Sequence, residues 1–291
     1  MNKILFFVAI FLFTTALGLY VGYNLIPQIG ETSPITGAPV EDVSNTLFFL
    51  FYILAVTAVL LVVLKFYKGK LLFRALEVLI IFVGSHMVYS FVLYDLVAIF
   101  NLPTSQVGYE NSILALAAFT TLIRFFKRRF LVLNTTLAIA IAGAGGVLGA
   151  TLGFIPSLLL VIALSIYDVV SVFGTKHMVK LADQSRLRQL PVMFETPSKG
   201  IKTGPRKGVK AREDILGLGT GDIAIPLVFF VSVLRDFSWT NVLGAVIGAL
   251  FGLAITIYYV TQVRRIALPA LPPIVGFSLV GFGLSLLFVT T

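Results

Sequence analysis

The sequence predicts an all-α membrane protein with nine transmembrane helices, and three observations support this. First, 58% of the 291 residues are hydrophobic and only 12% are charged, with a mean hydropathy of +1.01, whereas soluble domains carry roughly 25% charged residues. Second, the apolar residues form runs of about 17–25, the length at which a helix crosses a bilayer. Third, Lys and Arg lie between these runs. We therefore expect residues 1–291 to form a single polytopic domain in the lipid bilayer.

The predicted spans follow the apolar runs in chain order. They cover residues 4–25, 46–64, 74–94, 107–124, 130–150, 155–175, 215–234, 240–261 and 266–289. The first follows Lys3 as a signal peptide would, but about 22 apolar residues exceed the usual hydrophobic region of such a peptide. The fifth and sixth spans are separated only around Gly153 and Pro156, which we interpret as a turn.

The basic residues predict the orientation. Of the 22 Lys and Arg residues, all except Arg235 fall in segments that nine spans place on one side of the membrane. Cytoplasmic loops carry an excess of Lys and Arg, so the N-terminus is predicted to be cytosolic and the C-terminus external. The net charge of +9 is then a determinant of topology beside anionic lipid, and no nucleic-acid partner is expected.

Residues 176–214 are predicted to form a basic cytosolic loop between the sixth and seventh spans. This segment is polar and contains several Pro and Gly residues, a composition typical of loops. Within it, residues 190–194 (LPVMF) are apolar. They could pair as a strand with another extended segment, or lie on the membrane surface.

Composition excludes several classes of enzyme. The chain has no Cys and only two His residues, His86 and His177, so disulfides, thiolate metal sites, Cys nucleophiles and the common zinc hydrolase patterns are not expected. We predict no metal and no other cofactor. A serine protease built on Ser85 and His86 is also disfavoured, because adjacent residues on one helix point about 100° apart.

Small residues recur at intervals of four in two helices. Gly145, Gly149 and Gly153 form one series, and a second contains Gly244, Gly248 and Gly252. Such spacing lets helices approach closely in lipid, so both series predict helix packing.

Two acidic residues lie inside predicted spans. An ionised carboxylate at the centre of a transmembrane helix costs about 2.5–3.5 kcal/mol, so Asp168 and Asp222 require an explanation. Each is predicted roughly 12 Å below the cytosolic face, on consecutive antiparallel helices. If these helices pack together, the two carboxyl groups can share one proton.

A pair of carboxyl groups suits aspartic proteolysis. One group takes a proton from water while the other polarises the scissile carbonyl. On the predicted seventh helix, Gly219 precedes Asp222 by one turn and Pro226 removes the amide that would bond the Asp222 carbonyl. The alternative is a carboxylate-coupled ion transporter or cation channel, because paired acids in the membrane also bind protons or cations.

Three motifs resemble those of a known family. The Tyr167-Asp168 pair, the Gly219–Asp222 segment (GTGD) and the Pro269–Leu271 segment (PAL) resemble the YD, GXGD and PAL motifs of the presenilin and signal peptide peptidase family of intramembrane aspartyl proteases. The resemblance covers the whole chain and implies that Asp168 and Asp222 are catalytic. It further implies that the remaining motif residues shape the substrate-binding site, namely Tyr167, Gly219, Thr220, Gly221, Pro269, Ala270 and Leu271.

Within the family, the predicted orientation is similar to that of presenilin. Substrates would then be single-pass transmembrane proteins with an external N-terminus. Thr220 stands where presenilins carry Leu, and the sixth loop is short. The chain therefore resembles a small prokaryotic homologue that is located in the cell membrane and acts alone, without autoproteolysis or partner subunits.

Overall fold

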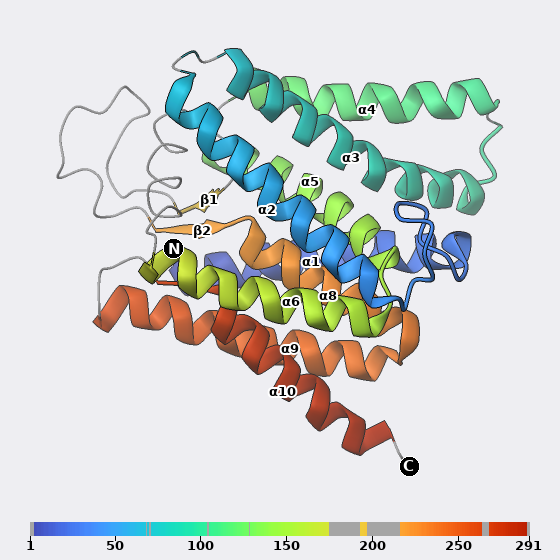
Figure 1. The fold of residues 1–291 in the computed structure, drawn as a ribbon. Helices are drawn as coiled ribbons and strands as arrows, with labels where there is room; N and C mark the ends of the chain where they lie inside the picture. Colours follow the sequence, from blue (N-terminus) through green and yellow to red (C-terminus); the bar gives the residue numbers. More distant parts are fainter. Residues whose placement is uncertain are drawn as a thin grey trace.

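The chain folds into a bundle of helices with a small sheet at one end (Figure 1). The computed structural model describes residues 3–67, 69, 71–103, 105–127, 129–174, 193–196, 216–263 and 268–289. In these ranges the helices are α1 (Lys3–Ile29), α2 (Val43–Phe66), α3 (Leu71–Ile99), α4 (Gln106–Phe126), α5 (Phe130–Ala150), α6 (Phe154–Val169), α8 (Gly221–Asp236), α9 (Trp239–Tyr258) and α10 (Leu271–Val289). Short π-helical segments, Val170–Gly174 and Tyr259–Val263, extend α6 and α9.

Each predicted span corresponds to one helix in the described ranges, so the all-α membrane fold is confirmed. Seven helical segments there are long and apolar enough to cross a membrane. The two others are α4 and α8, and α8 has only 16 residues. The count of nine spans and their orientation therefore stay predictions. Most of the predicted loop 176–214 lies outside the described residues.

The seventh span begins differently from the prediction. Residues 217–219 form strand β2 (Gly217–Gly219), which pairs antiparallel with β1 (Met193–Glu195), so that Phe194 lies opposite Leu218. The predicted helix over 217–219 is wrong, and α8 begins only at Gly221. Glycine disfavours the helix interior by about 1 kcal/mol, and pairing with β1 satisfies the backbone of this glycine-rich segment.

The ninth span also begins later than predicted. Pro269 and Ala270 precede the first turn of α10, which starts at Leu271. The ring of a proline disfavours the helical conformation of the residue before it. Both Leu268 and Leu271 precede a proline. This delays the helix by several residues relative to the predicted start at 266.

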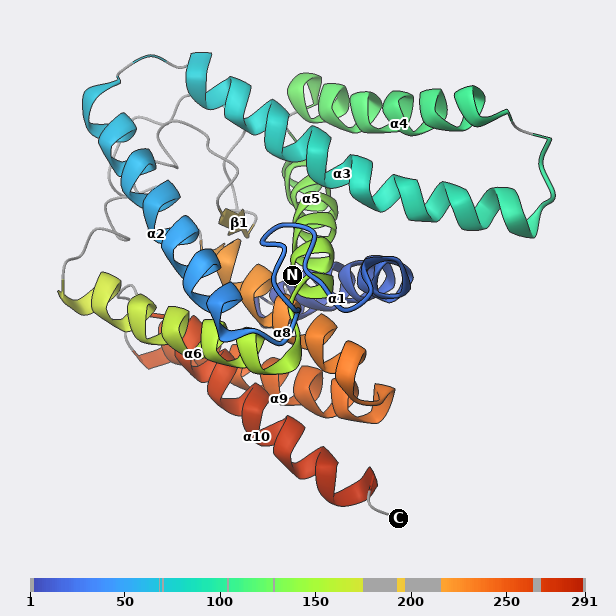
Figure 2. The same ribbon diagram turned by 45° about the vertical axis from the view of Figure 1, so that its right-hand side comes forward.

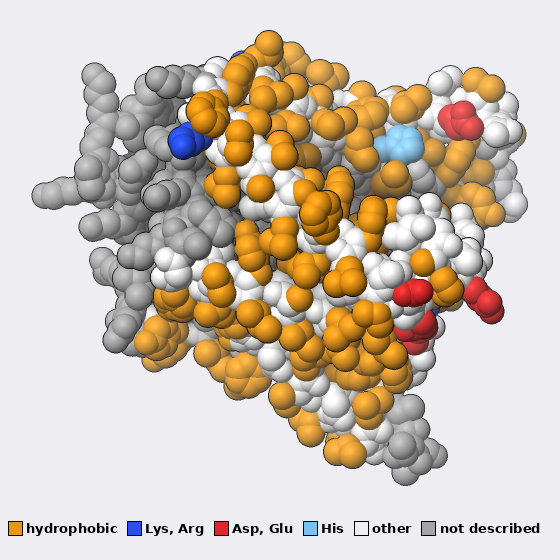
Figure 3. Space-filling view, viewed as in Figure 1, with side chains coloured by type: hydrophobic (Ala, Val, Ile, Leu, Met, Phe, Trp, Pro, Cys, Tyr) orange, Lys and Arg blue, Asp and Glu red, His pale blue; other side chains and the backbone are white. Residues whose placement is uncertain are grey.

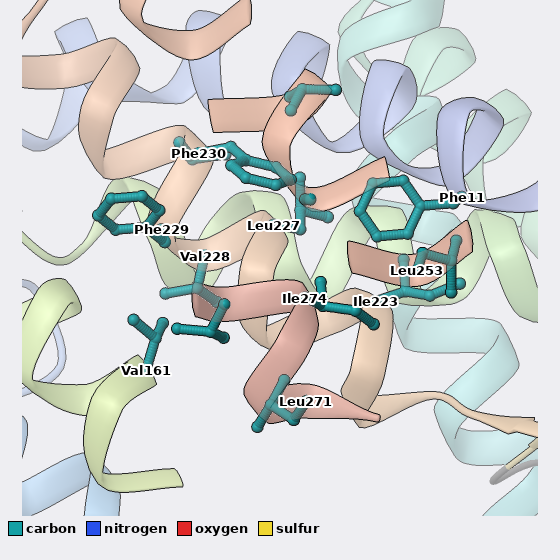
Figure 4. Close-up of a cluster of buried hydrophobic side chains, with 14 of the residues drawn as sticks. Phe11, Val161, Ile223, Leu227, Val228, Phe229, Phe230, Leu253, Leu271 and Ile274 are labelled. Atoms are coloured by element: carbon teal, nitrogen blue, oxygen red, sulfur yellow. The ribbon is translucent and has the colours of Figure 1, made fainter. Parts of the chain in front are cut away.

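Helix α8 lies in the middle of the bundle. It packs against α1, α5, α6, α9 and α10, and Figures 1 and 2 show α3 and α4 on one flank and α9 and α10 on the other. Its side chains Ile223, Leu227 and Phe230 are fully buried. Figure 4 shows Leu227 and Phe230 near Phe11 of α1, and Ile223 near Ile274 of α10. The core thus forms around the helix that begins at the GTGD segment.

The glycine series mostly mark close helix contacts, as predicted. A Cβ atom at Gly248 would lie 2.0 Å from the Phe277 carbonyl oxygen of α10, and one at Gly252 would lie 2.4 Å from that of Pro273. Gly145 and Gly149 face α8 in the same way, through Leu227 and Val228. Gly153 differs, because it precedes the first turn of α6 and faces the Glu41 carboxylate.

The surface agrees with a membrane environment. In Figure 3 the visible face is largely hydrophobic, and the Asp and Glu side chains gather toward the right-hand end. Exposed side chains such as Phe51, Phe66 and Leu71 lie on α2 and α3. A soluble protein rarely exposes apolar area of this extent.

Candidate active site

Asp168 lies at the end of α6, where the helix changes its geometry. It is the penultimate residue of the α-helical part, and the π-helical segment Val170–Gly174 follows. The Ser171 hydroxyl donates to the Asp168 carbonyl at 2.9 Å. The Asp168 side chain is half-buried, and its Oδ2 accepts the backbone N–H of Leu271 at 3.2 Å. The carboxylate of the YD motif is therefore held by the PAL segment.

Asp222 lies in the first turn of α8 and not in the interior of a helix. Its Oδ2 accepts the backbone N–H of Gly219 at 3.0 Å. The prediction that Gly219 and Asp222 share a helix face is wrong, because Gly219 belongs to β2. A helix N-terminus favours negative charge and offers N–H groups that have no partner in the helix. Asp222 thus enters an apolar region at the position where a helix best tolerates a carboxylate.

The helices that carry the two carboxyl groups lie side by side. Helices α6 and α8 pack against each other, and α10 packs against both. Leu271, whose amide binds Asp168, is buried in the same core as Ile223, the residue after Asp222. The structure therefore brings together the YD, GXGD and PAL segments, which the sequence separates.

The other residues of the YD and GXGD motifs adjoin these acids in the chain. Tyr167 is half-buried and adjacent to Asp168. A Cβ atom at Gly219 would lie 3.0 Å from Asp222 Oδ2, closer than ordinary contact, so glycine leaves room for the carboxylate. The Thr220 carbonyl accepts the Ala224 N–H at 2.9 Å and so starts α8. Gly221 is the first residue of that helix.

The sheet at the site connects β1 to α8. The apolar island of the sixth loop pairs as a strand at Met193–Glu195, so the strand alternative is confirmed for this part. Phe194 is fully buried and Leu218 is nearly so, which places the sheet against the core. The Thr196 N–H donates to the Leu216 carbonyl at 2.9 Å and extends the pairing.

Sequence reasoning missed Asn134, which binds this sheet from α5. Its side chain exchanges two hydrogen bonds with the backbone of Glu195. The signal was available, because Asn134 is a polar residue in an apolar run, but an uncharged amide is a much weaker indicator than an intramembrane carboxylate.

Other chemistries find less support in the described residues. No group of three His, Asp or Glu side chains there could hold a metal ion. The Ser85 hydroxyl donates to the Ile81 carbonyl of its own helix at 2.6 Å, and the His86 ring lies near Phe82. Neither forms a nucleophile and base pair with the other.

Comparison with known proteins bears directly on this site. The family model described as signal-peptide peptidase, presenilin aspartyl protease matches residues 8–291. The chain belongs to this family. It is thus an intramembrane aspartyl protease, a hydrolase, and the resemblance of its three motifs is confirmed at the level of the family. A search of curated proteins gives no significant match.

Solved structures show the same fold as this aspartyl protease. One is a presenilin family intramembrane aspartate protease in space group C222, with a TM-score of 0.69 and 24% identity over 98% of this chain and 99% of the other. Another is a presenilin family intramembrane aspartate protease in space group P2, with a TM-score of 0.68 and 24% identity over 99% of both chains.

Proposed function

We propose that Asp168 and Asp222 are the catalytic pair of this intramembrane aspartyl protease. The observation that carries the proposal is the pair of half-buried carboxyl groups on the packed helices α6 and α8, each held at Oδ2 by a backbone N–H. Leu271 of the PAL segment holds Asp168, and Gly219 of its own motif holds Asp222. Backbone donors fix the orientation of both side chains before substrate arrives, which is the preorganisation that catalysis requires.

The two Oδ1 atoms are assigned to water and substrate. The ionised carboxylate takes a proton from a water molecule, which attacks the scissile carbonyl carbon. The neutral carboxyl donates its proton to the carbonyl oxygen, so a tetrahedral diol forms. The carboxyl group that is now protonated then gives its proton to the leaving nitrogen, while the ionised one takes a proton from a hydroxyl of the diol, so the C–N bond breaks and the pair again holds one proton.

The substrate is proposed to bind as an extended strand at the outer edge of β2. Pairing alternates along an antiparallel ladder, and Thr196 bonds Leu216, so the backbone groups of Gly217 and Gly219 point away from β1. Gly219 already uses its N–H on Asp222. A substrate segment unwound from its helix exposes unpaired amides, and an open strand edge can satisfy them beside the catalytic pair.

The substrate class is proposed to be single-pass transmembrane proteins with an external N-terminus. The uneven distribution of Lys and Arg supports a cytosolic N-terminus and an external C-terminus. In Figure 1 the termini lie toward opposite ends of the bundle, which agrees with an odd number of spans. The remaining motif residues are proposed to line the substrate path, namely Tyr167, Thr220, Gly221, Pro269, Ala270 and Leu271. The protein is proposed to be located in a prokaryotic cell membrane.

The test is cleavage of a single-pass transmembrane reporter by the purified protein in detergent. Asp168→Ala and Asp222→Ala are each expected to abolish cleavage, and mass spectrometry of the wild-type fragments should locate the cut within the reporter span. Asp95→Asn is the matched control, because Asp95 lies on α3 and accepts a hydrogen bond from Tyr20 away from the site.

Persistent cleavage in either alanine variant would overturn the assignment of the pair. Ion flux through liposomes that depends on Asp168 and Asp222, without cleavage by the wild type, would instead support the transporter or channel alternative.

A further inference from the structure

Asn134 is a buried polar residue on α5, at the end of the bundle where the sheet lies. Its exposed fraction is 5%. The side-chain amide donates from Nδ2 to the Phe130 carbonyl of its own helix at 3.0 Å and to the Glu195 carbonyl at 3.1 Å. Its Oδ1 accepts the Glu195 N–H at 3.1 Å. Every donor of the amide therefore has a partner, and two of its three bonds reach β1.

The bonds to Glu195 imitate a neighbouring strand. In an antiparallel pair, one residue exchanges both of its backbone bonds with the residue opposite, and the Asn134 amide makes the same exchange with Glu195. The alternation of the ladder directs the backbone N–H and C=O groups of Glu195 away from Gly217, the residue opposite it on β2. Asn134 thus covers one edge of the sheet at Glu195 and leaves the edge of β2 next to Asp222 as the side for an added strand.

The helix that carries Asn134 is itself firmly placed. Arg124 of α4 donates to the Leu133 carbonyl at 2.5 Å and to the Thr136 hydroxyl at 2.9 Å. Arg124 also forms a buried ion pair with Glu77 at 2.8 Å. The residues on both sides of Asn134 are therefore fixed by α3 and α4, and α5 packs along α8.

We propose that Asn134 is a positioning residue that sets the register of β1 and β2 against Asp222 and thereby selects the peptide bond that is cut. This rests on the proposed function. Two strands of three residues each do not hold a fixed position alone. Phe194 anchors the sheet through burial, but an apolar contact does not specify a position along the strand, whereas the two bonds to one backbone residue do.

A positioning role and a purely structural role of Asn134 predict different effects on KM and on the cleavage site. A variant that only unfolds part of the enzyme lowers the amount of active protein and changes neither KM nor the bond that is cut. A sheet that has lost its register instead presents the substrate strand in several positions. It should raise KM and spread the cuts over neighbouring peptide bonds.

Asn134→Leu is the decisive variant, because leucine has a similar volume and neither bonding group. Loss of both hydrogen bonds to Glu195 is expected to raise KM about tenfold or more and to add cuts next to the wild-type bond. Asn134→Asp retains the acceptor for the Glu195 N–H and is expected to fall between these results. Asn24→Leu is the matched control, because the Asn24 amide donates to Tyr20 of its own helix.

The measurements are KM, kcat and fragment masses with the transmembrane reporter, together with hydrogen exchange of the peptide containing residues 193–195. Exchange of this peptide is expected to be faster in Asn134→Leu than in wild type or Asn24→Leu. Should Asn134→Leu fail to fold, the same readouts in Asn134→Asp decide the matter.

Unchanged KM and an unchanged cleavage site in a folded Asn134 variant, with active wild type, would overturn this inference alone. A wild type that does not cleave the reporter would overturn the proposed function and this inference with it. Altered cleavage sites in Asn24→Leu to the same extent would show that the effect is not specific to the sheet.

Discussion

Two pairs of acidic side chains lie at opposite ends of the packed helices α6 and α8, and they differ in how their carboxyl groups are used. Asp168 and Asp222 form the inner pair, and Asp236 forms the outer pair with Glu41, which precedes α2. At one end, Asp168 and Asp222 are half-buried and each accepts a single backbone N–H. At the other, Glu41 and Asp236 are exposed and both accept the N–H of Phe154, at 2.9 and 2.8 Å. The comparison separates acids that cap a helix from acids left available for chemistry.

The outer pair has a structural explanation that Asp168 lacks. Glu41 also accepts the Ile155 N–H at 3.2 Å, so the first amides of α6 are capped by carboxylates where the helix dipole favours negative charge. Asp168 instead lies at the C-terminal end of the same helix, where the dipole disfavours a negative charge. A carboxylate kept in such a place points to function.

The largest expected effect follows from replacing the inner acids by their amides. Asp168→Asn and Asp222→Asn keep the side-chain shape but cannot transfer a proton, so each should lower kcat by about 10³-fold or more. The double variant should be no slower than either single one, because the two groups act as a unit. Steady-state cleavage of the reporter measures this, and a double variant whose loss is the product of the single losses would contradict a shared mechanism.

A smaller effect is expected from Gly219→Ala. The added Cβ would lie 3.0 Å from Asp222 Oδ2, so the carboxylate must shift, and kcat should fall between about tenfold and about 100-fold. Gly276→Ala on α10 is the control, because a Cβ there meets no atom within 4 Å. Wild-type kcat in Gly219→Ala would show that the position of this oxygen is not critical.

Replacement of Arg235, the neighbour of Asp236, tests whether this end of α8 contributes to stability and not to catalysis. Its guanidinium donates to the Ala150 carbonyl at 2.6 Å and to the Gly30 carbonyl. Arg235→Met should therefore lower the free energy of unfolding by about 1–3 kcal/mol and leave kcat per folded molecule unchanged. Thermal unfolding and active-site-normalised cleavage measure the two quantities, and a fall in kcat without loss of stability would break the comparison.

The smallest effect is expected from Glu41→Gln. Glutamine retains an oxygen for the amides of α6, and the site is exposed, so stability should change by less than about 0.5 kcal/mol. Cleavage should match wild type within about twofold, far from the effect of Asp222→Asn. Thermal unfolding and active-site-normalised cleavage measure both quantities. A large loss of cleavage would show that Glu41 takes part in catalysis.

The sequence predicted the helices well because lipid imposes a simple rule on length and polarity. The predicted span 130–150 coincides with α5, and the turn around Gly153 separates α5 from α6. Prediction failed at Gly217–Gly219, where hydropathy continued into a segment that forms a strand. Apolar composition does not distinguish these conformations, and the partner strand lies more than 20 residues earlier in the chain.

The candidate acids were predictable for a different reason. A charged residue in an apolar run is a strong signal, so Asp168 and Asp222 were identified without structural information. What could not be predicted is the contact between segments, such as the Leu271 amide on Asp168 and the Asn134 amide on Glu195. Both join residues about 60 or more positions apart, and no local pattern encodes such pairing.

Cysteine cross-linking tests the convergence of the inner acids most directly. The chain contains no Cys, so Asp168→Cys combined with Asp222→Cys supplies two defined thiols. Asp168→Cys with Asp236→Cys supplies a control pair, because Asp236 lies at the opposite end of α8 from Asp222. Treatment with a short bifunctional thiol reagent, followed by intact mass measurement, should give an intramolecular cross-link in the first variant and none in the second. No cross-link in the first variant, with both thiols reactive toward a monofunctional reagent, would contradict the catalytic pair.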